Sequence, residues 1–193
     1  MVSFPHLFST FQLGSVTLKN RIFVPSHGTR HARNHQAGAD LIAYYEARAR
    51  GGVGMIFTEV CSVHSSYDVP NRISLTCDEY VPGVRRLADM CHSYDCAIVV
   101  QLYHPGRIPS QSLDGSRLVA YAPSEVMDEQ HRFQPYPMPA DLILEMVESF
   151  AEGVVRIVQE EFAVPWLRLR INKKSAVRGV RDVGVIIERG EFD

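Results

Sequence analysis

The sequence lacks the cysteine spacings that hold structural metals. Its four cysteines, at positions 61, 77, 91 and 96, include no CxxC pair. We therefore expect reduced thiols in a reducing compartment, and no metal.

Long hydrophobic runs and an excess of one charge are also missing. No apolar stretch of about 18 residues occurs, and the N-terminus has no charged region followed by an apolar one, so we expect a cytoplasmic protein that contacts no membrane. The 20 basic and 22 acidic residues give a formal net charge of −2. This balance exerts no long-range attraction on phosphate backbones, so nucleic acid is not an expected partner.

The chain does have enough apolar side chains for a core. Its 193 residues are 46% hydrophobic and 22% charged, which is typical of a globular protein. We expect a single domain over residues 1–193, with a long loop rich in Pro, Ser and Gly over residues 102–139.

The hydrophobic pattern predicts alternating strands and helices. A short hairpin is expected over Phe11–Leu18, and a helix over Asp40–Arg50, with Asp40 as its cap and a left-handed residue at Gly51-Gly52 as its stop. Further strands are expected at Arg21–Val24 (buried), Gly54–Thr58, Ala97–Gln101 and Pro165–Leu169, and further helices after Asp78, from Pro139 to about Glu161 and around Val177–Arg189.

The order β-α-β-α-β implies right-handed crossovers and a parallel sheet, which is either a barrel or a doubly wound sheet. A doubly wound dinucleotide-binding fold would carry a GxGxxG turn, and the sequence has none. Three of the predicted strands end in polar groups, at Val24-Pro25-Ser26-His27, Phe57-Thr58-Glu59 and Gln101 to Arg107. In a barrel of parallel strands such ends emerge on one face, where the chemistry takes place.

Three motifs resemble the Old Yellow Enzyme family of FMN oxidoreductases, over roughly residues 5 to 158. They are Leu18-Lys19-Asn20-Arg21-Ile22-Phe23-Val24-Pro25, the run from Ala49 to Glu59, and Gln101-Leu102-Tyr103-His104-Pro105-Gly106-Arg107. The branch that they resemble is that of 2,4-dienoyl-CoA reductase and trimethylamine dehydrogenase. The resemblance implies an α/β fold, a TIM barrel in which FMN lies across the strand ends, is reduced by NAD(P)H and passes hydride to an unsaturated or oxidised small molecule.

The resemblance also implies which residues contact the flavin. A primary amide such as Gln101 offers one donor and one acceptor to the pyrimidine edge; the less favoured alternative is a solvated amide at a strand end. The turn of Pro25 and Ser26 lies under the flavin, and Val60 contacts it through the backbone, so the neighbouring Glu59 carboxylate need not touch the cofactor and would need a partner if buried.

The resemblance implies a flavin contact for two further residues, and for each of them another role is about as well supported. His27 is the candidate catalytic residue, since an imidazole there can donate to the flavin O4; alternatively it is an exposed loop residue. Arg168 resembles an arginine beside the flavin N1 and O2, and alternatively lies on an amphipathic edge strand. His104 and Arg107 are expected to organise their loop.

The sequence departs from the family in length. A complete barrel needs about 250 residues, and after Val158 the acceptor-binding histidine pair and the proton-donating tyrosine of the family do not appear. We therefore expect a partial (β/α)8 barrel that lacks the strand-four region, the C-terminal strands and their phosphate-binding loops. By descent the chain is an enzyme; present activity and FMN retention stay open. The alternatives are a truncated, non-catalytic member, or a partial barrel that forms a homo-oligomer and acts as an interaction module.

Overall fold

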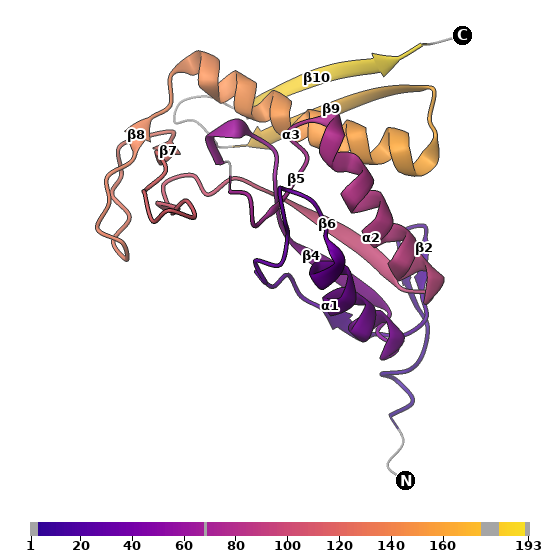
Figure 1. Ribbon diagram of the computed structural model, residues 1–193. Helices are drawn as coiled ribbons and strands as arrows, with labels where there is room; N and C mark the ends of the chain where they lie inside the picture. The colour runs from indigo at the N-terminus through magenta and orange to yellow at the C-terminus, as the bar shows by residue number, and fades with distance from the viewer. Residues whose placement is uncertain (1–3, 68, 175–181, 192–193) are drawn as a thin grey trace. The chain divides into compact units, whose positions relative to one another are not determined.

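The computed structural model describes residues 4–67, 69–174 and 182–191 (Figure 1). The chain forms two compact units. The first comprises residues 1–61, 70–74 and 79–101, and the second comprises residues 62–69, 75–78 and 102–193. We describe each unit by itself, and the single domain over residues 1–193 stays a prediction.

The first unit is built on parallel strands with helices between them, as the sequence predicts. β3 (Phe23–Val24) runs parallel to β4 (Met55–Ser62), with Phe23 opposite Met55. β6 (Ala97–Tyr103) also pairs with β4. β5 (Ile73–Ser74) follows β4 in the strand order and is the fourth strand of this sheet. The backbone bond from Ala97 N to Gly54 O marks the N-terminal ends of β4 and β6.

The two helices of the first unit each bury one apolar face. α1 (Ala39–Arg50) buries Leu41, Tyr45 and Ala49, which stand four residues apart. The prediction that Asp40 caps this helix is wrong, because Gly38 holds the N-cap position and Asp40 lies in the first turn. Gly52 has the left-handed φ of 95° that was expected after the helix. α2 (Val81–Ser93), the helix expected after Asp78, buries Val84, Leu87, Ala88 and Cys91.

The start of the chain forms the predicted hairpin. β1 (Phe11–Leu13) and β2 (Val16–Leu18) are antiparallel, and Gly14 between them has a φ of 59°. The buried strand expected over Arg21–Val24 is wrong in two respects: it is shorter, and Phe23 is 55% exposed. The reason is that β3 pairs only with β4 among the described strands, so its other edge is uncovered.

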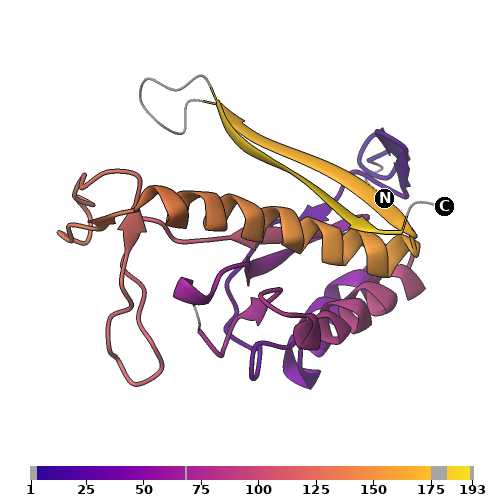
Figure 2. The ribbon, with the colours of Figure 1, turned by 90° about the horizontal axis from the view of Figure 1, so that it is seen from above.

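The second unit joins a long helix to a hairpin. α3 (Ala140–Phe162), β9 (Trp166–Lys174) and β10 (Asp182–Gly190) follow one another, and the two strands pair antiparallel with Glu188 opposite Arg168. The hairpin lies along α3 in both views (Figures 1 and 2). Ala151 and Val155 of α3 and Ile187 of β10 form the core of this contact, and Leu167, Leu169, Ile171 and Val185 pack around them.

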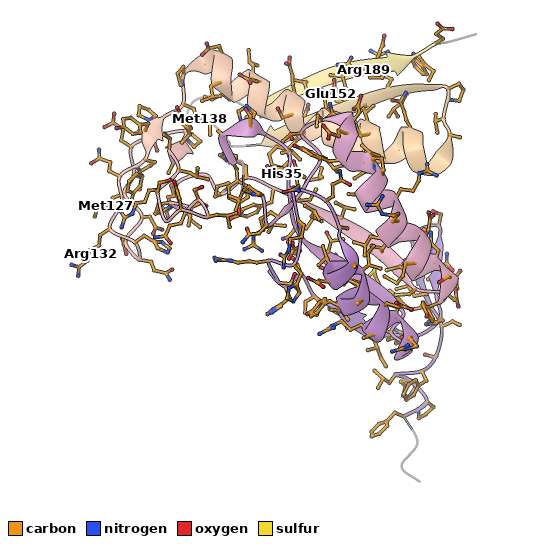
Figure 3. All side chains as sticks on the ribbon, in the orientation of Figure 1. His35, Met127, Arg132, Met138, Glu152 and Arg189 are labelled. Atoms are coloured by element: carbon orange, nitrogen blue, oxygen red, sulfur yellow. The ribbon has the colours of Figure 1, made fainter. Side chains whose placement is uncertain are left out.

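The helix predicted around Val177–Arg189 is therefore wrong where the structure describes it, and residues 177–181 lie outside the described residues. Val185 and Ile187 alternate with exposed neighbours, as in a half-buried strand. Arg189 of β10 also forms an ion pair with Glu152 of α3, and both side chains are labelled in Figure 3.

The remaining elements are short. The segment predicted as a long loop contains β7 (Tyr121–Ala122) and β8 (Tyr136–Pro137), which pair in parallel. Two 3₁₀ turns, η1 (Ser65–Tyr67) and η2 (Asp78–Tyr80), complete the set. In the part of the chain that the structure describes, no helix combines the length and apolarity needed to cross a bilayer, and the described strands form no closed barrel.

Candidate functional site

Polar side chains from three neighbouring strands converge in the first unit. The backbone N–H of Gln101, on β6, donates to the hydroxyl of Thr58 on β4 over 3.2 Å. The hydroxyl of Ser26, just after β3, donates to the side-chain oxygen of Gln101. We call Ser26, Thr58 and Gln101 the strand-end cluster. The prediction that these polar residues meet is confirmed, although β4 and β6 continue to Ser62 and Tyr103, so Thr58 and Gln101 lie within their strands.

The strand-end cluster presents polar groups to solvent. Thr58 is fully buried, whereas Pro25, Ser26, His27 and Gln101 are exposed. The side-chain oxygen of Gln101 accepts from Ser26, and no described residue pairs with its amide nitrogen. An exposed amide with a free donor, beside a hydroxyl, can pair with the polar edge of a flat heterocycle.

Glu59 is fully buried within β4, and its carboxylate holds the loop that follows β3. One carboxylate oxygen accepts from the backbone N–H of Thr29 (2.8 Å), the hydroxyl of Thr29 (2.7 Å) and the backbone N–H of Arg30 (3.2 Å). The same oxygen lies 3.7 Å from a guanidinium nitrogen of Arg72. The sequence predicts that a buried Glu59 needs a partner, but it did not indicate Thr29 or Arg72.

Two atoms of this buried pair remain unsatisfied. The second carboxylate oxygen of Glu59 and the guanidinium nitrogen Nη1 of Arg72 make no hydrogen bond within the described residues. A Cβ on Gly28 would lie 2.7 Å from that nitrogen, so the glycine leaves room for the arginine. Since buried polar atoms are nearly always paired, a water or a bound polar group is the expected partner here.

Tyr45 supports the same corner from α1. Its hydroxyl accepts a 2.6 Å hydrogen bond from the backbone N–H of Glu59. Burial, and to a lesser extent the nearby carboxylate of Glu59, raise the pKa of the Tyr45 hydroxyl above its ordinary range, so it stays protonated. β4 is thus held at Glu59 by a neutral hydrogen bond to the Tyr45 hydroxyl and by the hydrogen bonds to the Glu59 carboxylate.

The other predicted site residues occupy different positions. Val60 is half-buried on β4, and the exposed His27 makes no hydrogen bond or ion pair to any described residue. Arg168 belongs to the second unit, where it is exposed on β9 and forms a 3.3 Å ion pair with Glu188 of β10. The structure brings Ser26 and Gln101 together, and their proposed contacts with a cofactor stay predictions, as do those of Pro25, His27, Val60 and Arg168.

The second unit contains a chain of hydrogen bonds that the sequence did not reveal. The Ser66 hydroxyl lies 2.8 Å from His64 Nδ1 and 2.9 Å from His104 Nε2, and His64 Nε2 lies 3.0 Å from a carboxylate oxygen of Glu145. Backbone N–H groups of Ser66 and Gly106 donate to the Nδ1 atoms of His64 and His104. Both Nδ1 atoms are therefore acceptors, so each neutral ring carries its proton on Nε2.

This arrangement fixes the direction of every bond. His104 donates to the Ser66 hydroxyl, Ser66 donates to His64, and His64 donates to Glu145. Burial, with a smaller contribution from the nearby His64, lowers the pKa of His104 to about 4. The prediction that His104 organises its loop is confirmed, and Arg107 of the same loop lies 3.9 Å from the carboxylate of Asp128.

Comparison with known proteins identifies the family. Residues 6–162 match the model of the NADH:flavin oxidoreductase / NADH oxidase family. A metal reductase of Desulforamulus reducens is 34% identical over 78% of this chain and 22% of its own length, and an NADH oxidase of Thermoanaerobacter brockii is 35% identical over 81% and 24%. An NADPH dehydrogenase of Listeria welshimeri is 31% identical over 82% of this chain and 46% of its own length.

Solved structures support the same fold. Morphinone reductase superimposes with a TM-score of 0.67 at 23% identity, covering 81% of this chain and 46% of its own. A 2-naphthoyl-CoA reductase gives a TM-score of 0.70 at 19% identity, over 80% and 26%. The chain thus spans between about a quarter and a half of the relatives that it matches. Its fold is a partial (β/α)8 barrel, and the chain belongs to the NADH:flavin oxidoreductase / NADH oxidase family, which includes Old Yellow Enzyme.

Proposed function

We propose that this chain forms the flavin-binding part of an FMN-dependent oxidoreductase that takes hydride from NAD(P)H and delivers it to an unsaturated or oxidised small molecule. The observation that carries the proposal is the convergence of Ser26, just after β3, with Thr58 of β4 and Gln101 of β6, on the side of the sheet towards which these strands run. Barrel enzymes place their chemistry at this end. Relatives named NADH oxidase and NADPH dehydrogenase support the same reaction class.

The donor set of the strand-end cluster fits a flavin. The amide nitrogen of Gln101 has no partner among the described residues and can donate to the pyrimidine edge, while its oxygen is oriented by Ser26. Backbone groups of Pro25, Ser26 and Val60 would line the ring. Bound FMN would supply the acceptance and release of hydride.

Within this proposal, His27 is the candidate catalytic group. It is exposed beside Ser26 and has no described partner, so its ring is available to donate a hydrogen bond to the cofactor. Arg168 would contribute a positive charge near the ring. To do so, its guanidinium would have to break its ion pair with Glu188 and pair with the cofactor.

The proposal extends to the setting of the reaction. The chain would act on a small molecule in the cytoplasm, where the nicotinamide pool supplies reductant, and would belong to the branch of 2,4-dienoyl-CoA reductase and trimethylamine dehydrogenase. A homo-oligomer is the proposed assembly, because the uncovered edge of β3 can accept another strand.

The visible spectrum of the purified chain tests the proposal. A band near ~450 nm that persists through desalting, or saturable quenching of added FMN fluorescence, is the expected result. A folded chain that neither retains flavin nor binds added FMN saturably would overturn it. Light scattering on the same sample separates a colourless dimer from a colourless aggregate.

The role of Gln101 has its own test. Gln101→Leu removes the amide while keeping a similar volume, and we expect the Kd for FMN to rise about tenfold, which corresponds to ~1.4 kcal/mol. Gln111→Leu, at another exposed glutamine, is the matched control and should leave the Kd unchanged. Equal affinities of wild type and Gln101→Leu would contradict the proposed role of this amide.

A further inference from the structure

Two cysteines meet where α2 turns into β6. The backbone N–H groups of Tyr94 and Cys96 both donate to the carbonyl of Cys91 over 3.1 Å, and that of Asp95 donates to the carbonyl of His92 over 2.9 Å. Asp95 has a left-handed φ of 50°. These bonds define a Schellman motif, which places the side chains of its C3 and C″ residues in contact. Both of these residues, Cys91 and Cys96, are cysteine.

The two thiols are close enough to react with each other. Their residues are joined by the direct backbone hydrogen bond of 3.1 Å, and a disulfide requires Cα atoms within about 7 Å. Both side chains are buried, with exposed fractions of 0% for Cys91 and 1% for Cys96, and neither forms a disulfide. The pair is therefore a dithiol shielded from large reagents.

The surroundings make the two sulfurs unequal. A hydrogen bond from the Cys91 thiol lowers the pKa of Cys96, helped by the positive charge of Lys19 and opposed by burial and by Asp95. The Lys19 ammonium is held at this turn by a hydrogen bond to the carbonyl of Tyr94. The same thiol–thiol hydrogen bond, together with burial, raises the pKa of Cys91. Cys96 is thus the more acidic thiol of the pair and Cys91 is the less acidic one.

A small cavity lies against Cys96. It has a volume of about 230 Å³ and is lined by Val16 and Thr17 of β2, by His92 and Asp95 at the end of α2, and by Cys96. The cavity admits molecules the size of water, so hydrogen peroxide can enter it. It also includes Gly54, just before β4, but no residue of the strand-end cluster, and is therefore a separate site.

We propose that Cys91 and Cys96 form a peroxide-sensitive thiol pair, in which Cys96 reacts first and Cys91 resolves the product. The Cys96 thiolate attacks one oxygen of hydrogen peroxide, the O–O bond breaks, and Cys96 sulfenic acid and hydroxide form. The Cys91 sulfur then attacks the sulfenic sulfur, the S–O bond breaks, and water leaves with the Cys91 proton. Two thiols are oxidised to one disulfide, and one peroxide is reduced.

Mass mapping of the oxidised chain tests this proposal. Both cysteines lie in one tryptic peptide, from Leu87 to Arg107. After brief treatment with hydrogen peroxide, denaturation and alkylation, we expect this peptide to lose two hydrogens and to carry no alkyl group. Cys77, which is half-exposed, and the buried Cys61 should remain alkylated, with oxidation of Cys77 slower by roughly tenfold. Oxidation of Cys77 as fast as Cys96, or full alkylation of the peptide, would overturn the proposal.

Two variants separate the roles of the sulfurs. Cys91→Ser removes the resolving thiol, so peroxide should leave a sulfenic acid on Cys96 that dimedone traps. Cys96→Ser should abolish peroxide reactivity in this peptide, whereas Cys77→Ser should leave disulfide formation unchanged. Dimedone labelling of Cys91 in Cys96→Ser, at the rate seen for Cys96, would contradict the assignment. The peptide mass map of the wild-type chain tests the proposal even if a variant does not fold.

Discussion

At the residue scale, the buried Glu59 holds the loop that follows β3 in the first unit. It is fully buried, accepts three hydrogen bonds from Thr29 and Arg30, and faces the guanidinium of Arg72, of which 14% is exposed. Removing one member of a buried ion pair is costly because the remaining charge is left without compensation. The loop that carries His27 should therefore loosen when this charge is lost.

Glu59→Gln keeps the size and one acceptor but removes the charge. We expect the free energy of unfolding to fall by about 3 kcal/mol, measured by urea denaturation at neutral pH. Asp40→Asn is the matched control, since Asp40 pairs with Arg33 at the surface over 3.4 Å, and its effect should stay under ~1 kcal/mol. Equal effects of the two variants would show that the buried pair contributes no more than the exposed one.

His104 should make stability depend on pH. Its pKa is lowered to about 4 in the folded chain, from the ordinary value of 6.5. Above pH 6.5 the residue is neutral in both states. As the pH falls from 6.5 towards 4, the unfolded chain takes up a proton that the folded chain does not, so the free energy of unfolding decreases.

Urea denaturation at several pH values measures this slope. We expect His104→Asn to flatten the loss of stability between pH 6.5 and 4, because the titrating ring is gone. His6→Asn, at an exposed histidine near the N-terminus, should leave the slope unchanged. If His104→Asn retains the full slope of the wild type, the loss arises from other groups.

At the scale of elements, the hairpin of β9 and β10 packs against α3 through the side chains of one of its two faces. Ile187 is 8% exposed and contacts the core of Ala151 and Val155, whereas the adjacent Ile186 is 51% exposed. Successive side chains of a strand point to opposite faces, so these two isoleucines differ only in which face they occupy.

Alanine substitutions at the two positions measure that difference. Ile187→Ala should lower the free energy of unfolding by about 2–4 kcal/mol, because it leaves a cavity against α3. Ile186→Ala should cost under ~1 kcal/mol. A similar cost at both positions would contradict the strand over Asp182–Gly190 and would suit a helix there better.

At the scale of the whole molecule, the sheet has uncovered edges. Among the described strands, β3 and β6 each pair only with β4, and Phe23 on β3 is 55% exposed. An exposed apolar edge strand is a template for pairing with another chain. Self-association that increases with protein concentration is the expected consequence.

A charge on the edge should oppose that association. Phe23→Lys should lower the light scattering of concentrated samples and raise the soluble fraction. Phe8→Lys changes the net charge equally at a residue that is 61% exposed outside any strand, and it should have a smaller effect. If both variants raise solubility to the same extent, net charge and not the strand edge is responsible.

Much of the fold follows from short-range spacing. The helices α1, α2 and α3 and the strands between them were predictable because apolar residues three or four apart define a helix face, and alternation defines a strand. The tail was mispredicted because a short apolar run such as Val185-Ile186-Ile187 suits either structure, and only packing against α3 selects the strand.

The sequence alone determined the family and the polar strand ends, since both are written in contiguous residues. Tertiary structure decided which buried groups are partners: Thr29 and Glu59 are 30 residues apart, and His64 and Glu145 are 81 apart. The physical reason is that a hydrogen bond between distant residues exists only after the chain has packed, and no local spacing encodes it. The contact of Cys91 with Cys96 lies between these cases, because its spacing is visible in the sequence but only the left-handed turn at Asp95 brings the thiols together.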